Sequence, residues 1–252
     1  MINPHAPSKQ PTAIMAPPKR ALIAITSAHA PLYPEGKETG LFITEALHPY
    51  DVFTKAGFEV DLVSETGTYS PDWLSTTDDW LKPEERKVYE DHSSDFRSKL
   101  DKLYKPSDLT SSDYGIFFAS AGHASLIDYP DAKGLQKIAS DIWANGGIVS
   151  AVCHGGAIFK GIVDEQGVPI IKGKNVTGFT TKGEEEEGVL DTIKSWDRPT
   201  IEASAESLGA KYVSPPGPWD SFTQTDGRLV TGANPASAEA TGEAAVKAFE
   251  KL

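Results

Sequence analysis

The sequence predicts an α/β domain with a mostly parallel sheet that helices cover on both faces. Short apolar runs typical of buried strands alternate with segments of helical periodicity along most of the chain. Such alternation indicates parallel strands joined by helical crossovers, which are almost always right-handed. With 252 residues, 39% of them apolar, the chain is long enough to bury a sizeable core.

Seven segments have strand character, and the last two are expected near an edge of the sheet. In chain order they are residues 20–26, 58–63, 114–119, 147–152, 175–179, 211–213 and 228–231. Three segments carry apolar residues at helical spacing beside a capping signal. They cover residues 42–57, 135–146 and 237–252, with Gly57, Asn145-Gly146 and Ser237 as the respective capping residues.

One connection, residues 66–113, is too long for a simple crossover. It contains a short amphipathic helix pattern on Phe96, Leu100 and Leu103. A connection of this length is usually a lid or a partner-contact element, and a plain surface insertion fits it equally well. We expect it to form an insertion or cap on a single domain over residues 19–252. Residues 1–18, rich in proline and without a long apolar run, are expected to be a disordered tail.

The net charge of −12 argues against nucleic acid or an anionic membrane surface as a partner. No apolar stretch approaches the ~20 residues that a membrane-spanning helix needs. A single cysteine excludes an internal disulfide framework, so a reducing, cytoplasmic compartment is expected.

That cysteine, Cys153, follows the strand-like run 147–152 and enters a glycine-rich turn. Small residues on either side, Ala151 and Gly155, would allow the sharp strand-to-helix turn of a nucleophile elbow. The amides at the start of the following helix would favour a thiolate and lower the pKa of Cys153. The alternative is that Cys153 is a small buried apolar side chain, as most lone cysteines are. The flanking glycines and the adjacent His154 favour the functional interpretation.

Polar residues follow four of the predicted strands, and the carboxyl ends of parallel strands meet at one edge of a sheet. These strand ends are residues 26–29, 120–123, 153–154 and 180–184. Gly122-His123 forms a small-residue turn whose amide, with that of His154, could hold an oxyanion; a plain turn is the alternative.

Two acidic features could contribute to the same site. Glu45 lies beside the apolar stripe of its helix, near Pro49, which cannot bond back to the Glu45 carbonyl. Buried next to a thiol it would be a proton shuttle, but a place on the solvated face is the commoner outcome. The run Glu184–Glu187 is most often solvated, and at most one member would face a pocket.

No metal is expected, because the six histidines never pair at ligand spacing and no second thiol exists. No histidine follows His154. Conventional papain-like proteases, α/β-hydrolase-type cysteine enzymes and working glutamine amidotransferases need one downstream of the nucleophile, so all three are excluded.

Several motifs together resemble the ThiJ/PfpI superfamily. The similarity is greatest to its fungal branch of heat-shock-protein-31-like chaperones and glutathione-independent glyoxalases (glyoxalase III). The matching segments are residues 44–49, 57–67, 119–123 (Ala-Ser-Ala-Gly-His), 128–130, 151–155 (Ala-Val-Cys-His-Gly), 177–180, 217–220 (Gly-Pro-Trp-Asp), 225–232 and 234–238. The resemblance spans roughly residues 18 to 252.

This resemblance implies a flavodoxin-like three-layer sandwich of the class I glutamine-amidotransferase type with a lid-like insertion. It implies Cys153 as nucleophile, His154 as triad histidine, Glu184 as triad acid and Glu45 as the acid that contacts the thiol. The implied activity is conversion of methylglyoxal to D-lactate without a cofactor, by a homodimer. Gly156 stands where the family often has proline, which predicts a looser turn.

Two other functions are compatible with the sequence. The first is a holdase chaperone that binds unfolded client proteins through apolar surface around Trp73 and Trp80. The second is a redox sensor in which Cys153 is oxidised to sulfinic acid.

Overall fold

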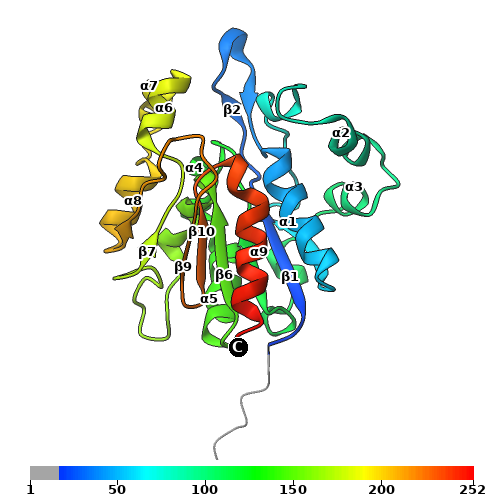
Figure 1. Cartoon of the computed structure of the whole chain (residues 1–252), viewed down its shortest axis with the longest axis vertical. Coiled ribbons are helices and arrows are strands. Elements are labelled where there is room, and N and C mark those ends of the chain that lie inside the picture. The colour runs from blue at the N-terminus through cyan, green and yellow to red at the C-terminus, as the bar shows by residue number, and fades with distance from the viewer. Residues whose placement is uncertain (1–16) are drawn as a thin grey trace, which may run out of the picture.

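A computed structural model describes residues 17–252, so the expected tail at residues 1–18 lies almost entirely outside the described residues. Its centre is a six-stranded sheet in the order β4-β1-β5-β6-β10-β9 (Figure 1). The first five strands are parallel and β9 runs antiparallel to β10. The strands are β1 Arg20–Ile25, β4 Glu59–Ser64, β5 Ile116–Ala119, β6 Ile148–Val152, β9 Thr223–Asp226 and β10 Leu229–Gly232.

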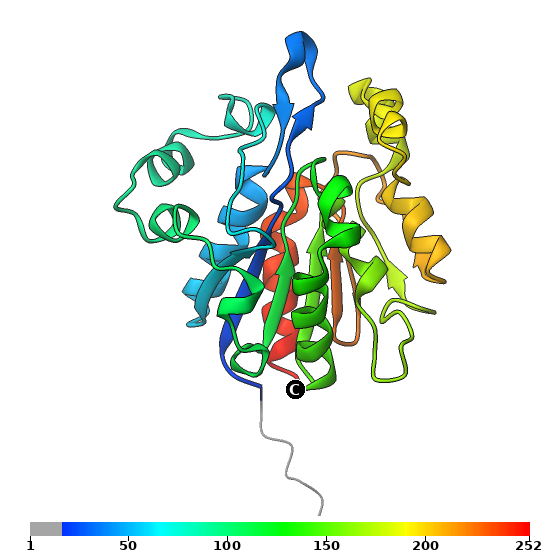
Figure 2. The ribbon, with the colours of Figure 1, turned by 180° about the vertical axis from the view of Figure 1, so that it is seen from behind.

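Helices cover both faces of the sheet, which gives the predicted three-layer α/β architecture. Successive side chains of a strand point to opposite faces, so Leu22 and Phe117 join one apolar cluster while Ile23 and Phe118 join the other. Helices α1 (Ile43–Lys55) and α9 (Ala238–Phe249) complete the second cluster (Figure 1). Helix α5 (Lys133–Ala144) covers the opposite face, which Figure 2 shows from behind.

The expectation that residues 175–179 and 211–213 belong to the main sheet was wrong. Strands β7 (Asn175–Val176) and β8 (Lys211–Tyr212) pair in parallel with each other in a separate small sheet. Residues 228–231 lie in β10, one strand in from the edge. The edge strand β9 was not predicted, because its sequence Thr-Gln-Thr-Asp has no apolar run.

The long connection between β4 and β5 carries two helices that lie beyond α1 (Figure 1). The predicted amphipathic helix is α3 (Asp95–Leu100), with Phe96 and Leu100 buried, whereas α2 (Pro83–Glu90) was not predicted. The remaining strands and α-helices are β2 Ala30–Pro31, β3 Glu38–Thr39, α4 Ser125–Asp128, α6 Thr181–Glu187, α7 Leu190–Ser195 and α8 Ile201–Ser207. The 3-10 helices are η1 Pro34–Gly36, η2 Leu74–Thr76, η3 Pro106–Asp108, η4 Ser111–Asp113, η5 Tyr129–Asp131, η6 Cys153–Gly161 and η7 Pro235–Ser237. Within residues 17–252, every helix is too short or too polar to span a bilayer.

Candidate active site

The backbone makes a sharp turn at Cys153, directly after β6. Cys153 has a φ of 57°, a left-handed conformation that costs a side-chain-bearing residue roughly 1–2 kcal/mol. The surrounding chain holds it there: the Phe179 amide donates to the Cys153 carbonyl, at 3.3 Å. A Cβ on Gly155 would overlap the Ala119 carbonyl, so the turn requires glycine at that position. Helix η6 begins at Cys153 itself, which places the side chain at the carboxyl end of the sheet.

A thiol, an imidazole and a carboxylate follow one another at this point. The Cys153 Sγ atom lies 3.2 Å from Nδ1 of His154, and Nε2 of His154 lies 2.7 Å from Oε1 of Glu184. Glu184 is carried by α6, where the Thr180 hydroxyl caps the helix by accepting from the Gly183 amide. The order of groups is that of a nucleophile, a base and an orienting acid.

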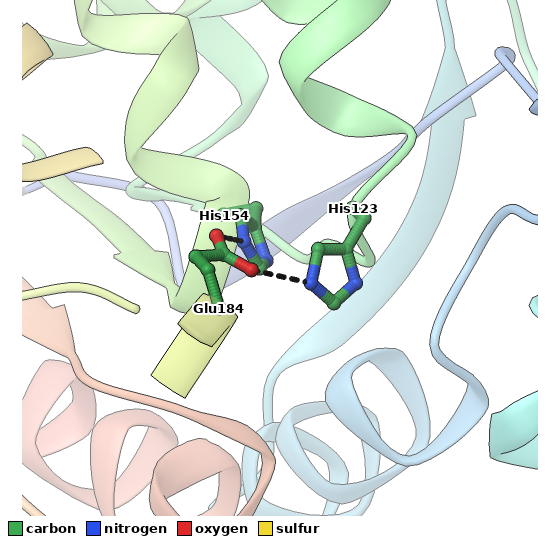
Figure 3. A group of neighbouring side chains, drawn as sticks. All are labelled: His123, His154 and Glu184. Carbon is green, nitrogen blue, oxygen red and sulfur yellow. Dashed lines mark hydrogen bonds and ion pairs between the residues drawn. The ribbon is translucent and has the colours of Figure 1, made fainter. Parts of the chain in front are cut away.

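The same carboxylate also binds a second histidine (Figure 3). Nε2 of His123 lies 2.9 Å from Oε2 of Glu184 and 3.5 Å from a carboxylate oxygen of Glu187. The His123 and His154 rings pack together with centroids 4.1 Å apart. Only the backbone of the Gly122-His123 turn had been expected to contribute, so the contact of this side chain is a finding of the structure.

Charge is distributed unevenly over this group. Burial would lower the pKa of His123, but the carboxylates of Glu184 and Glu187 outweigh it and raise that pKa to about 9. Burial and the neighbouring His123 cation lower the pKa of His154 to about 4. Burial opposes ionisation of Glu184, yet the two imidazoles lower its pKa to about 2. At neutral pH, His154 is therefore neutral. Since Glu184 can only accept, Nε2 of His154 carries the proton and Nδ1 presents its lone pair to the sulfur.

Glu45, in the first turn of α1, is fully buried. Neither carboxylate oxygen has a hydrogen-bond partner of good geometry among the described residues. Burial raises the pKa of Glu45 to about 8, against the opposing influence of the Cys153 thiol and of His123. Burial first, and then the Glu45 carboxylate, raise the pKa of Cys153 well above its usual value. Lowering of the thiol pKa by the helix was therefore a wrong prediction, although the His154 amide does act in that direction.

The two groups are coupled, because a buried thiolate and a buried carboxylate side by side would repel each other. With both pKa values raised, the Glu45 carboxyl and the Cys153 thiol are both protonated at neutral pH, and ionisation of either one opposes ionisation of the other. A carboxyl held protonated beside a sulfur can pass its proton to a substrate and take it back.

Gly122 adopts a φ of 155°, and a Cβ there would overlap the Gly40 carbonyl oxygen. This close approach brings the turn after β5 against the segment that leads into α1, where the Phe42 amide donates to the Ala121 carbonyl at 2.7 Å. A role of the Gly122 and His154 amides in holding an oxyanion stays a prediction.

Three residues of metal-ligating type do converge, since ligand atoms of His123, His154 and Glu184 lie within 4.8 Å of one another. However, both carboxylate oxygens already accept from imidazole nitrogens, and the raised pKa of His123 keeps that ring protonated. A cation would have to displace this proton and both hydrogen bonds. The donor set therefore fits a hydrogen-bonded triad better than a metal centre.

Two further residues near the site were not singled out from the sequence. Asp72 is buried, accepts from the Tyr33 hydroxyl at 2.8 Å and from the Ser75 amide at 3.0 Å, and contributes to the raised pKa of His123. Trp219 packs on Phe179, whose ring contacts both site histidines. The Gly-Pro-Trp-Asp motif was the available signal for Trp219, whereas no pattern pointed to Asp72.

Fold and site together define a class: α/β proteins of ThiJ/PfpI architecture with a buried cysteine, histidine and glutamate at the strand ends. A solved structure of glyoxalase III from Candida albicans is 50% identical to this chain, with a TM-score of 0.90 over 92% of this chain and 98% of that one. A ThiJ/PfpI domain protein from Brachyspira murdochii, 14% identical with a TM-score of 0.60, shares the fold.

Sequence comparison gives a narrower assignment. Glyoxalase 3 of Candida albicans is 51% identical over 232 residues, covering 92% of this chain and 98% of that protein. Glutathione-independent glyoxalase HSP31 of Saccharomyces cerevisiae is 50% identical over 234 residues, with 92% and 99% coverage. No protein-family model matches the chain. The chain belongs to the family of HSP31-like glutathione-independent glyoxalases.

Proposed function

We propose that this protein converts methylglyoxal and similar small 2-oxoaldehydes to 2-hydroxy acids, giving D-lactate from methylglyoxal, without glutathione. The observation that carries the proposal is the buried Cys153 sulfur, coupled to a protonatable Glu45 and 3.2 Å from the free Nδ1 of His154. Support comes from relatives about half identical along nearly the whole chain that bear the glyoxalase name. The reverse reaction would be the dehydration of D-lactate, which places the enzyme among the lyases.

The first step forms a covalent adduct. The Cys153 sulfur bonds to the aldehyde carbon, and the thiol proton passes through His154 or Glu45 to the aldehyde oxygen, giving a hemithioacetal. Neutral His154 is suited to this transfer because Glu184 fixes its tautomer and orients the ring. Amides near Gly122 and His154 would stabilise the developing oxyanion.

The second step moves a hydrogen between two carbons. A base removes the proton from the former aldehyde carbon, and the electron pair forms an enediol with the neighbouring carbon. The base, whose proton can exchange with solvent, then protonates that neighbouring carbon, and the hydroxyl proton of the former aldehyde carbon passes to the neighbouring oxygen, which leaves a lactoyl thioester on Cys153. Glu45 is the better base of the two, because its pKa of about 8 lies near the working pH whereas that of His154 is about 4.

In the third step water attacks the thioester carbonyl, the carbon–sulfur bond breaks, and the sulfur regains its proton as the hydroxy acid leaves. The sum is one methylglyoxal plus one water giving one lactate, with no net oxidation. Redox and group-transfer cofactors therefore have no part in the balance.

The test is to incubate the purified chain with methylglyoxal in the absence of any thiol and to assay D-lactate stereospecifically. We expect turnover by the wild type and none by Cys153→Ser. Production of L-lactate, or equal turnover by Cys153→Ser, would reject the proposal. Running the reaction in D2O tests the base: Glu45→Gln, but not His154→Ala, should abolish deuterium exchange at the substrate carbons.

The two alternative functions have less support. Only Tyr104, Trp219 and Leu252 are large exposed apolar side chains among residues 17–252, and Trp73 and Trp80 are half-buried, so the connection between β4 and β5 offers no broad client surface. Oxidation to sulfinic acid requires an exposed thiolate, whereas Cys153 is 4% exposed with a raised pKa.

A further inference from the structure

The reactive sulfur is almost closed off from solvent. Cys153 is 4% exposed, and Glu45 and His154 are fully buried. A carbonyl compound can reach the sulfur only past the side chains that cover it. The identity of those side chains therefore bears directly on which substrates are accepted.

An arc of aromatic rings leads from the site to the surface. The Phe179 ring lies 4.7 Å from the ring of His154 and 5.5 Å from that of Trp219. Trp219 lies 6.4 Å from Trp80, which meets Phe42 edge-on at 5.3 Å. Phe42 immediately precedes α1, the helix that carries the site carboxyl. The arc thus starts at the histidine and ends at the helix on the other side of the sulfur.

Trp219 is held in place from both sides along the backbone. The side-chain amide of Asn234 donates to the carbonyls of Pro218 and Asp220, each at 2.8 Å. Asn234 is fully buried, and its carbonyl oxygen accepts from the Ser237 hydroxyl at 2.8 Å. Both side-chain N–H groups of Asn234 therefore bind the residues on either side of Trp219 in the chain. This connects the Gly-Pro-Trp-Asp and Asn-Pro-Ala-Ser motifs of the sequence, which catalysis alone leaves unexplained.

The side chain is fixed as well. The Trp219 indole N–H donates to a carboxylate oxygen of Glu186 at 2.9 Å, on the same short helix as Glu184. Trp219 nevertheless remains 38% exposed. A large apolar ring held at the surface by this many polar contacts contributes little to the core, which indicates a function at the surface.

We propose that Trp219 and Trp80, whose rings pack against each other, are specificity-determining residues that cover the entrance to Cys153 and restrict the substrate to small, unbranched 2-oxoaldehydes. This proposal rests on the function proposed above. Trp80 is contributed by the long connection between β4 and β5, and Trp219 by the loop before β9. Two segments distant in sequence therefore form the entrance.

The first experiment measures kcat/KM for phenylglyoxal and for methylglyoxal. Trp219→Ala and Trp80→Ala should each raise the phenylglyoxal-to-methylglyoxal ratio about tenfold, the scale on which a pocket discriminates by size. Trp219→Phe, which keeps a ring but loses the bond to Glu186, should fall between. Tyr104→Ala, which removes an exposed aromatic from the same connection, is the matched control and should leave the ratio unchanged.

The second experiment does not depend on turnover. Cys153 is the only cysteine, so alkylation reports on access to this sulfur alone. Trp219→Ala should accelerate modification by N-benzylmaleimide more than modification by the smaller iodoacetamide. If Trp219→Ala accelerated modification by both reagents equally, the structure would be generally loosened and the proposal would be overturned. The proposal would also be overturned if both tryptophan variants had a native circular dichroism spectrum and an unchanged phenylglyoxal-to-methylglyoxal ratio. A wild type that converts no 2-oxoaldehyde would reject the proposed function but leave this test of the entrance valid.

Discussion

The imidazole rings of His123 and His154 lie 4.1 Å apart at an angle of 39°, and they differ in charge. One carboxylate, that of Glu184, binds both rings through its two oxygens. Glu187 adds a second negative group on the His123 side only. The proton therefore resides on His123, and its charge keeps a second proton off His154.

Removing the His123 cation should raise the pKa of His154. In His123→Gln, we expect the acid limb of the kcat/KM profile to move upward by about one pH unit, because two unit charges about 4 Å apart repel by at least about 1 kcal/mol even under full solvent screening and one pH unit corresponds to about 1.4 kcal/mol. His48→Gln, which alters a histidine on the outer face of α1, should not move the limb. A loss of kcat with an unshifted limb would contradict this electrostatic role and leave His123 a packing role alone.

Glu184→Gln should lower kcat by about 10²–10⁴-fold, in the range seen when an orienting acid of a catalytic triad is neutralised. The amide cannot accept from two imidazoles at once, so His154 loses its fixed tautomer. Glu185→Gln, an exposed change on the same helix, should leave kcat within a factor of two. If kcat fell comparably in the two variants, the effect would come from the net charge of α6 rather than from the contacts of Glu184 with the histidines. Steady-state kinetics with methylglyoxal distinguishes these results.

Glu45→Gln should flatten the pH dependence of stability. The folded-state pKa of Glu45 is raised from 4.5 to about 8, so its contribution is fully present below pH 4.5 and is lost as pH rises through 8. Each pH unit in that window removes at most about 1.4 kcal/mol. Relative to the wild type, we expect the variant to gain up to about 4 kcal/mol of stability between pH 4.5 and pH 8, as measured by urea unfolding. The exposed Glu165→Gln is the control. A wild-type-minus-variant difference that does not change with pH would refute the raised pKa.

Gly122→Ala should be far more damaging than Gly146→Ala. Both glycines have positive φ, 155° at Gly122 and 86° at Gly146, so both substitutions carry a conformational cost. At Gly146 the added methyl meets open space, but at Gly122 it overlaps the Gly40 carbonyl oxygen. We expect an additional loss of about 2 kcal/mol and reduced turnover for Gly122→Ala alone. Thermal unfolding of the two variants side by side would show it, and equal melting temperatures would disprove it.

Much of this fold was predictable because the central strands are apolar on both faces. The runs that became β1, β4, β5, β6 and β10 were all recognised in this way. The edge strand β9, Thr223–Asp226, is polar and only partly buried, so it has no such signature. Residues 175–179 were misplaced because only Asn175 and Val176 pair, and with β8 rather than with the main sheet.

Some of the site residues could likewise be predicted from the sequence, and others could not. Cys153, His154, Glu45 and Glu184 came from motifs, and the structure brings all four together. The roles of the His123 side chain and Asp72 depend on contacts between segments far apart in the chain, which no local pattern encodes, and the Gly-Pro-Trp-Asp motif marks Trp219 without showing what it contacts. The direction of the Cys153 pKa was mispredicted for the same reason: the helix start is local, whereas the burial and the neighbouring carboxyl are tertiary.

The seven-residue helix α6 places three carboxylates in three different settings. Glu184 holds the histidines, Glu187 supports the His123 charge, and Glu186 tethers the Trp219 indole. A displacement of α6 along its axis would therefore change both the pKa values of the two site histidines and the position of the Trp219 ring, which we propose controls substrate entry. Because one short helix carries all three carboxylates, a substitution in α6 that changes the reactivity of the site is expected to change its substrate selectivity as well.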